Sequence, residues 1–139
     1  MKALLSHATG GPETLRLGDI DAPEPGPGQV RIRVHACGVN YPDWLIIEDK
    51  YQFRPDRPFA PGGEVAGIVD ALGDGVDDVN VGDRVMALVS WGGMAEQVVA
   101  DAVQCVQIPP EMPFDEAAGL LFTYGTSYHA LKQRAAMVA

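Results

Sequence analysis

The sequence predicts a mainly β domain with short helices and a helical C-terminal segment, and three observations support this fold class. Apolar and polar residues alternate over residues 30–36, which is the period of a half-buried strand. The 139 residues include 16 glycines and 11 prolines, which favours many turns and short elements. Beyond residue 110 the apolar spacing changes to that of a helix. The length matches the commonest size of a single domain.

The first elements follow from local patterns. Residues 2–6 are predicted to form a strand that pairs, after a Gly-Gly-Pro turn, with a second strand over residues 15–20. Residues 22–28 form a loop that stays extended because proline fixes φ. The strand over residues 30–36 follows, and a short helix is predicted over residues 40–47, with a proline suited to its first turn.

The remaining β segments lie between residues 62 and 108, after a proline-rich loop. They are predicted at residues 62–72, 79–85 with a tight turn, 86–89, 94–100 and 105–108. A helix then begins near Pro113, where Asp115 and Glu116 suit the positive end of the helix dipole. Gly125 is predicted to interrupt this helix before a second one over residues 126–137.

Charge and cysteine content exclude several classes of partner. The chain has 10 basic and 19 acidic residues, so its net charge of −9 repels a polyanion and argues against nucleic acid. Two widely separated cysteines and no export-type leader favour free thiols and a cytoplasmic protein. Apolar runs are far shorter than the roughly 20 residues of a membrane helix, so no membrane contact is expected.

Known catalytic motifs are mostly missing from the sequence. The histidines are too far apart to build a zinc site locally, although His35 and Cys37 share a strand face. That pair is either the start of a metal site or a surface histidine beside a packed cysteine. The glycine-rich stretch at residues 73–78 carries three aspartates, which would repel a pyrophosphate. No phosphate loop or serine nucleophile elbow occurs, so hydrolase functions lose support.

Polar residues beside glycines are the remaining candidates for function, because loops and strand ends usually carry it. They are Asn40, Tyr41, Asp43, Tyr51, Glu64, Thr123, Tyr124 and Thr126. A structural interpretation also stays open. Asn40 and Asp43 would then cap the short helix, and Glu64 would pair with an arginine inside the sheet.

Five segments, taken in order, resemble a known family. They are residues 36–43 (ACGVNYPD), 61–69 (PGGEVAGIV), 81–85 (VGDRV), 93–96 (GMAE) and 123–131 (TYGTSYHAL). Together they resemble the N-terminal, GroES-like catalytic domain of medium-chain dehydrogenases/reductases, specifically the zinc-independent NADPH:quinone oxidoreductase branch. The resemblance covers nearly the whole chain, and it implies one GroES-like, partly open β-barrel over residues 1–139.

The resemblance also implies a metal-free reaction. Zinc-dependent relatives carry a cysteine and a histidine ligand where this chain has Asn40 and Gly63, which cannot replace a thiolate and an imidazole. The cysteine cluster that holds structural zinc in those relatives is missing too. The reaction implied is hydride transfer from NADPH to a quinone or an α,β-unsaturated carbonyl, with hydrogen-bond donors in place of a metal.

Roles for individual residues follow from the same resemblance. Asn40, Tyr41 and Asp43 are predicted catalytic residues, with helix capping ranked first for Asp43. The predicted cofactor-binding residues are Asn40, Tyr51, Thr123 and Thr126.

Full-length members of the family continue into a Rossmann domain, which this chain lacks. We therefore expect an excised catalytic domain whose own affinity for NADPH is weak or nil, because the cleft needs both walls. Its last helix, including Leu131 and Met137, should be uncovered on one side, which favours a homodimer. The alternative function is a non-catalytic GroES-like binding or assembly module.

Overall fold

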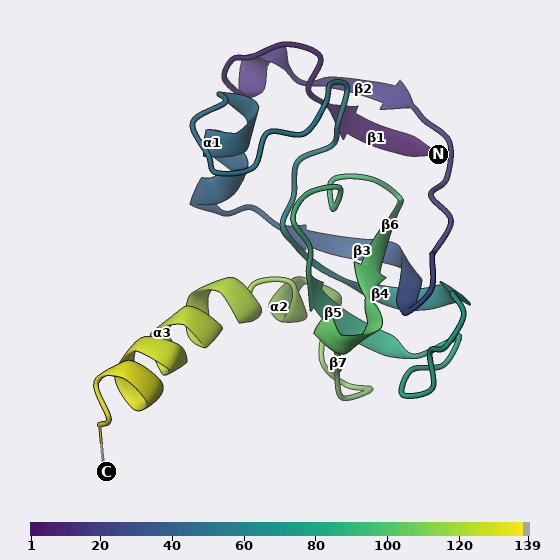
Figure 1. Ribbon diagram of the computed structural model, residues 1–139, viewed down its shortest axis with the longest axis vertical. Helices are drawn as coiled ribbons and strands as arrows, with labels where there is room; N and C mark the ends of the chain where they lie inside the picture. Colours follow the sequence, from purple (N-terminus) through teal and green to yellow (C-terminus); the bar gives the residue numbers. More distant parts are fainter. Residues whose placement is uncertain (138–139) are drawn as a thin grey trace.

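A computed structural model describes residues 1–137, which form two β-sheets and a projecting C-terminal helix (Figure 1). The strands are β1 (Lys2–Leu5), β2 (Arg16–Asp19), β3 (Gln29–Gly38), β4 (Glu64–Leu72), β5 (Arg84–Leu88), β6 (Gln97–Asp101) and β7 (Cys105–Gln107). The helical elements are η1 (Pro12–Thr14), α1 (Tyr41–Ile47), η2 (Ala102–Gln104), α2 (Phe114–Ala117), η3 (Leu121–Gly125), α3 (Thr126–Tyr128) and η4 (His129–Arg134). The predicted mainly β fold class is confirmed.

The larger sheet has five strands in the order β6-β3-β4-β5-β7, and every neighbouring pair is antiparallel. On β3, Val30 and Ile32 are completely buried, whereas Arg33 is exposed. Val65 and Val69 of β4 pack into the same core. The alternation that predicted this strand reflects one buried and one solvated face.

The N-terminal strand connects the smaller sheet, β1-β2, to two loops. β1 pairs with β2 in antiparallel register, as predicted, and its other edge contacts two loops. Ala3 forms a bridge with Ala95, and the Leu4 N–H donates to the Met94 carbonyl at 2.8 Å. Ser6, the residue after β1, pairs in the same way with Phe59, so this segment joins the smaller sheet to the loops that carry Phe59 and Met94.

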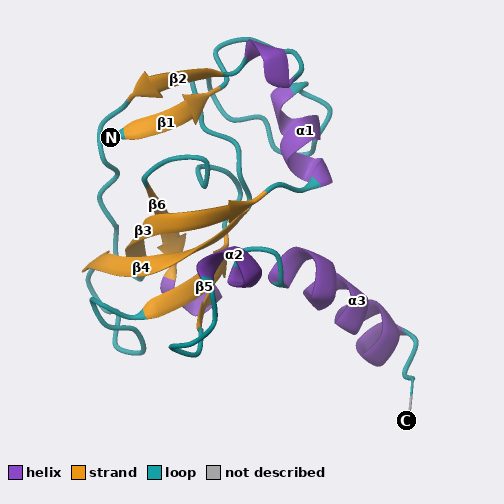
Figure 2. Cartoon of the chain, turned by 180° about the vertical axis from the view of Figure 1, so that it is seen from behind, coloured by secondary structure: helices purple, strands orange, loops and turns teal. Residues whose placement is uncertain are grey.

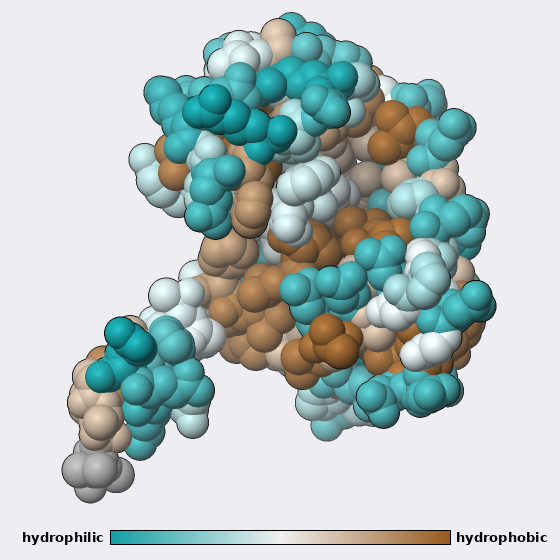
Figure 3. All heavy atoms as spheres, viewed as in Figure 1, coloured by the Kyte–Doolittle hydropathy of each residue, from teal (hydrophilic) through white to brown (hydrophobic). Residues whose placement is uncertain are grey.

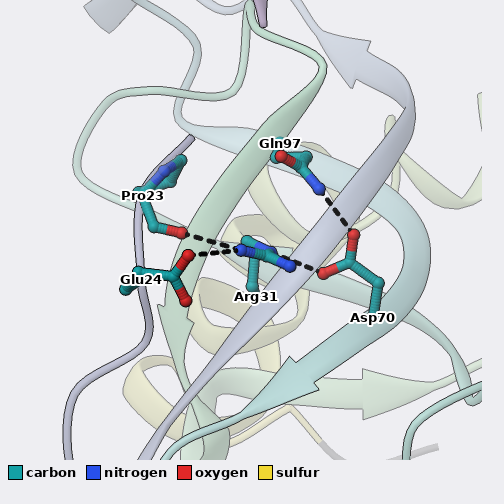
Figure 4. A network of polar contacts seen from close by, with 5 residues as sticks. All are labelled: Pro23, Glu24, Arg31, Asp70 and Gln97. Atoms are coloured by element: carbon teal, nitrogen blue, oxygen red, sulfur yellow. Dashed lines mark hydrogen bonds and ion pairs between the residues drawn. The ribbon is translucent and has the colours of Figure 1, made fainter. Parts of the chain in front are cut away.

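A network of hydrogen bonds and ion pairs connects side chains on the solvated face of the larger sheet (Figure 4). Arg31 of β3 donates to the Asp70 carboxylate of β4 at 2.7 Å and to Glu24 of the proline-rich loop at 3.1 Å. Gln97 of β6 donates to the other Asp70 oxygen at 2.7 Å. The hydrogen bond to Asp70 is the main cause of the raised pKa of Arg31. Three adjacent strands and a loop therefore share one ionic cluster.

The predicted strand at residues 79–81 is wrong. The Asp83 carboxylate accepts the Asn80 N–H at 2.9 Å, and the Asp83 N–H donates to the Asn80 carbonyl at 3.1 Å, so this segment forms a turn. Val79 is buried from a loop, and β5 begins only at Arg84.

The prediction for the C-terminal helix needs correction as well. Gly125 has helical φ and ψ of −60° and −45°, so it does not interrupt a continuous helical run from Leu121 to Arg134. Its N–H reaches the Leu120 carbonyl five residues back, which is the wide turn of a π-helix. The run ends before Met137 and projects away from the sheets (Figure 2). No helix within residues 1–137 has both the length and the apolar character needed to cross a bilayer.

Candidate functional site

Asp43 holds the start of α1 against the sheet. One of its carboxylate oxygens accepts the Asn40 N–H at 2.7 Å, and the other accepts the Gly62 N–H at 3.0 Å. The side chain is buried, and it forms a capping box with Asn40, in which each side chain faces the other residue's backbone N–H. The capping role predicted for Asp43 is therefore present in the structure.

Burial raises the pKa of Asp43 above its ordinary range. Backbone N–H groups, including those of Asn40 and Gly62, oppose this rise, whereas the nearby Glu64 carboxylate adds to it. Two carboxylates thus lie at the N-terminal end of α1, and both accept hydrogen bonds from amides.

Glu64, at the first position of β4, joins Asn40 to the base of the C-terminal helix. Its side chain is completely buried. Oε2 accepts a hydrogen bond from Asn40 Nδ2 at 2.9 Å, and Oε1 accepts the Phe122 N–H at 3.0 Å. The interpretation that pairs Glu64 with an arginine is wrong, because the carboxylate is bonded to these two amides.

An apolar cavity of about 500 Å³ opens beside these residues, and we call it the α1 pocket. Figure 3 shows apolar surface in the hollow of this side of the molecule and where the C-terminal helix leaves the sheets. The lining of the α1 pocket includes Asn40, Tyr41 and Asp43, together with Leu4, Pro12, Leu15, Val39, Trp44, Ile47, Pro61 and Met94. Its volume and its few polar groups are typical of a small-molecule site. All three predicted catalytic residues therefore border one cavity.

Tyr51 does not line the α1 pocket. Its ring packs against the cluster around Ile46 and meets Phe53 edge-on, with ring centroids 5.7 Å apart. Phe53 in turn lies 6.3 Å from Trp91, which lines a separate cavity of about 390 Å³. The sequence analysis did not predict that Phe53 and Trp91 form an aromatic group with Tyr51 beside this second cavity. The closely spaced aromatic residues at positions 51 and 53, next to a proline-rich loop, could have indicated it.

The two predicted threonines lie on the C-terminal helix, and both are exposed. The Thr123 hydroxyl donates to the Gly119 carbonyl at 2.6 Å, so its proton is already engaged. Thr123 follows Phe122, whose N–H binds Glu64, and this contact connects the helix to Asn40. The cofactor-binding roles of Thr123 and Thr126 stay predictions.

The residues present do not fit a zinc ion. Asn40 turns its side-chain nitrogen toward Glu64, and Gly63 has no side chain. A Cβ at Gly63 would lie 3.3 Å from the Val89 carbonyl, a tight contact, and 3.5 Å from the Phe122 ring, an ordinary one. His35 stacks on Phe114, and the described residues contain no group of three or more candidate ligands.

Cys37 lies close to the buried carboxylates but is not activated. Burial raises the pKa of its thiol to about 12, and the charges of Asp43 and Glu64 contribute to the rise. Its sulfur packs so closely on Gly62 that a Cβ there would approach to 2.7 Å. Cys37 is therefore a packed thiol rather than a nucleophile or ligand.

Comparison with known proteins yields consistent similarities. The alcohol dehydrogenase GroES-like domain profile matches residues 26–110. The human synaptic vesicle membrane protein VAT-1 homolog is 41% identical over 133 residues, covering 94% of this chain and 34% of that protein. The bovine quinone oxidoreductase-like protein 2 is 43% identical over 109 residues, covering 78% of this chain and 31% of that protein.

Solved structures agree with these similarities. The human VAT-1 homolog-like protein superposes with a TM-score of 0.94 at 39% identity, over 99% of this chain and 44% of that one. The Escherichia coli quinone oxidoreductase complexed with NADPH gives 0.90 at 27% identity, over 96% and 41%. The chain spans about a third of the length of the curated relatives that it matches.

Proposed function

The chain belongs to the alcohol dehydrogenase GroES-like domain family, and from this premise we propose that it is the catalytic domain of a zinc-independent oxidoreductase. The proposed reaction transfers hydride from NADPH to a quinone or an α,β-unsaturated carbonyl. Relatives named as quinone oxidoreductase-like proteins support an oxidoreductase role. Similar solved structures that contain NADPH support this cofactor.

The hydrogen bond between Asn40 and Glu64 supports the proposal most directly. An amide NH₂ group has two N–H donors, and Glu64 engages one of them. The second N–H has no hydrogen-bond partner among residues 1–137 and is available to an oxygen of the substrate. A preorganised donor of this kind stabilises the negative charge that develops on a carbonyl oxygen without the help of a metal.

The other residues of the site orient and enclose the reactants. Bound NADPH supplies the hydride, and the hydride needs a dry, apolar surround. Trp44 and Met94 contribute apolar walls to the α1 pocket, and Tyr41 presents an exposed ring at its edge. Tyr51 and Thr126 are proposed to contact the nicotinamide end of the cofactor.

The decisive test adds a dinucleotide-binding domain, which forms the other side of the cofactor cleft in the family. We would fuse residues 1–139 to the dinucleotide-binding domain of a relative and follow NADPH oxidation with tetramethyl-1,4-benzoquinone. Asn40→Ala should lower kcat/KM by about 10²–10³, the range for the loss of one oxyanion donor. Val103→Ala is the matched control, because this side chain is 93% exposed and lies outside the site.

A folded fusion that binds NADPH but reduces neither a quinone nor an enone would contradict the enzymatic proposal. That outcome would favour the alternative of a binding or assembly module. Metal analysis of the purified chain checks zinc independence separately, since stoichiometric zinc would contradict that part of the proposal.

A further inference from the structure

We propose that Glu64 is a positioning residue, which holds the Asn40 amide in place and couples it to the start of the C-terminal helix. The inference rests on the proposed function for what Asn40 does to a ligand. The positioning itself follows from the hydrogen bonds that Glu64 makes with both partners.

The orientation of the Asn40 amide follows from donor and acceptor chemistry. A carboxylate can only accept hydrogen bonds, so the Asn40 atom that lies 2.9 Å from Glu64 Oε2 must be the nitrogen. The amide oxygen then lies at the other end of the group, on the side of the Asp43 N–H in the capping box, and that N–H donates to the Asn40 backbone carbonyl at 3.0 Å. Glu64 therefore holds the nitrogen end of the amide, and one N–H remains for a ligand.

The burial of Glu64 argues that this arrangement is more than packing. The side chain is completely buried, and a buried carboxylate is costly unless its oxygens are hydrogen-bonded. An apolar residue of similar size would fill the space without that cost. What the carboxylate adds is the ability to fix two N–H groups, one from Asn40 and one from Phe122, at a set separation.

Phe122 makes the same carboxylate a link to the C-terminal helix. Its N–H binds Oε1 of Glu64, and Thr123, a predicted cofactor contact, is the next residue. The Phe122 ring borders the space beside Gly63. A shift at the base of this helix therefore moves the carboxylate that holds Asn40, so the amide and the helix should respond together.

The first test needs only the 139-residue chain and heteronuclear NMR. In the wild-type chain, the two side-chain N–H protons of Asn40 should exchange with solvent at different rates, because Glu64 protects only one of them. The Phe122 amide proton should be protected as well. Equal exchange of both Asn40 protons at the rate of a free amide would overturn the proposal without any variant.

Glu64→Gln tests the coupling. The new side chain has one acceptor oxygen and an NH₂ group that only donates, so it cannot replace both carboxylate oxygens, which accept from Asn40 and Phe122 separately. We expect a shift of the Asn40 side-chain resonances and exchange at Phe122 that is about tenfold faster or more, which corresponds to about 1.4 kcal/mol. Glu116→Gln is the matched control, because Glu116 is an exposed carboxylate on α2. If Glu64→Gln left both signals at their wild-type values, the proposal would fail.

The double variant Asn40→Asp with Glu64→Gln exchanges donor and acceptor while it conserves the net charge. The new carboxylate at position 40 accepts from the new amide at position 64, so Phe122 protection should recover even if the single variant folds poorly. Persistent loss of Phe122 protection in a folded double variant would contradict the positioning role.

The double variant has no side-chain N–H left at position 40 for a ligand. In the fusion protein with NADPH and tetramethyl-1,4-benzoquinone, kcat/KM should therefore stay as low as for Asn40→Ala. If Phe122 protection and kcat/KM both recovered, the donor role of Asn40 in the proposed function would be wrong, whereas the positioning by Glu64 would stand.

Discussion

At the scale of single residues, the burial of Cys37 suits the proposed reaction, whose substrates would be electrophiles. Thiolates add to quinones and enones, so a reactive thiolate beside the site would be a liability. Burial holds the pKa of Cys37 at about 12, against an ordinary value of 9.0. The thiol is therefore protonated at neutral pH.

This protonation predicts slow alkylation. Below the ordinary thiol pKa, the thiolate fraction of Cys37 should be about a thousandfold smaller in the folded chain than in the unfolded chain, from the difference between 9.0 and about 12. Iodoacetamide labelling followed by peptide mass spectrometry measures the rate, and urea should restore it. The Cys37→Ser chain identifies the signal from Cys105. Labelling of native Cys37 at the unfolded rate would contradict the assigned burial.

Asp43 predicts a dependence of stability on pH. Its folded pKa lies above the ordinary value of 3.8, so between these two values the folded chain binds a proton that the unfolded chain has released. The contribution of Asp43 to stability is fully present below 3.8 and falls as the pH rises through the folded pKa. This direction is opposite to that of Asp19 or Asp49, whose folded pKa values are lowered by hydrogen bonds.

Asp43→Asn isolates this contribution. The variant keeps only one acceptor oxygen for the N–H groups of Asn40 and Gly62, so it should lose about 1–3 kcal/mol of stability. The loss relative to wild type should shrink as the pH rises through the window. Urea unfolding at a series of pH values measures it. A loss that grows with pH would show that the folded pKa of Asp43 is lowered instead.

At the scale of elements, the Arg31 cluster in Figure 4 holds β3, β4 and β6 together. Arg31→Met would leave the half-buried Asp70 without its cation, and we expect a loss of about 1 kcal/mol in the free energy of unfolding, since both side chains keep some solvent. Lys2→Met removes an exposed pair with Asp19, which solvent screens, and should change stability much less than Arg31→Met does. Equal effects in urea unfolding would contradict the special role of the cluster.

The elements also show how far sequence alone could reach. Alternation around Val30 and Ile32 predicted β3, because one face of that strand is buried and the other is solvated. The tight turn within residues 79–85 was predicted, but the strand expected before it was wrong, because β-branched valines on either side of Asn80 outweighed the bond that the Asp83 side chain makes locally. The prediction that Gly125 interrupts the helix was wrong, because glycine can adopt helical backbone angles and nothing in the space around Gly125 prevents it.

The candidate site was predictable only where its residues are close together in the sequence. Asn40, Tyr41 and Asp43 lie within four positions, so one helix start brings them together at the α1 pocket. The bond between Asn40 and Glu64 joins residues 24 positions apart, and only the pairing of β3 with β4 creates it. No local pattern marks such a contact.

At the scale of the whole molecule, the most conspicuous feature is the helical run that extends beyond the sheets in Figures 1 and 2. Tyr124, Tyr128 and Leu131 of this run are between 48% and 69% exposed, as expected for an uncovered helix, and Met137, just beyond its end, is 54% exposed. Large apolar side chains that lie together on an exposed helix tend to be covered by association. A second copy of the chain offers the same face, so two helices can pair symmetrically.

We therefore expect the isolated chain to form a homodimer through this helix. Sedimentation velocity over a range of concentrations should show a dimer that dissociates on dilution, and Leu131→Glu should shift it to monomer by placing a charge in the contact. Val103→Glu adds the same charge to an exposed position on η2 and should leave the dimer intact. If the wild-type chain stayed monomeric at every concentration, the prediction would be wrong, and the apolar face of the helix would have to pack against its own chain instead of a second copy.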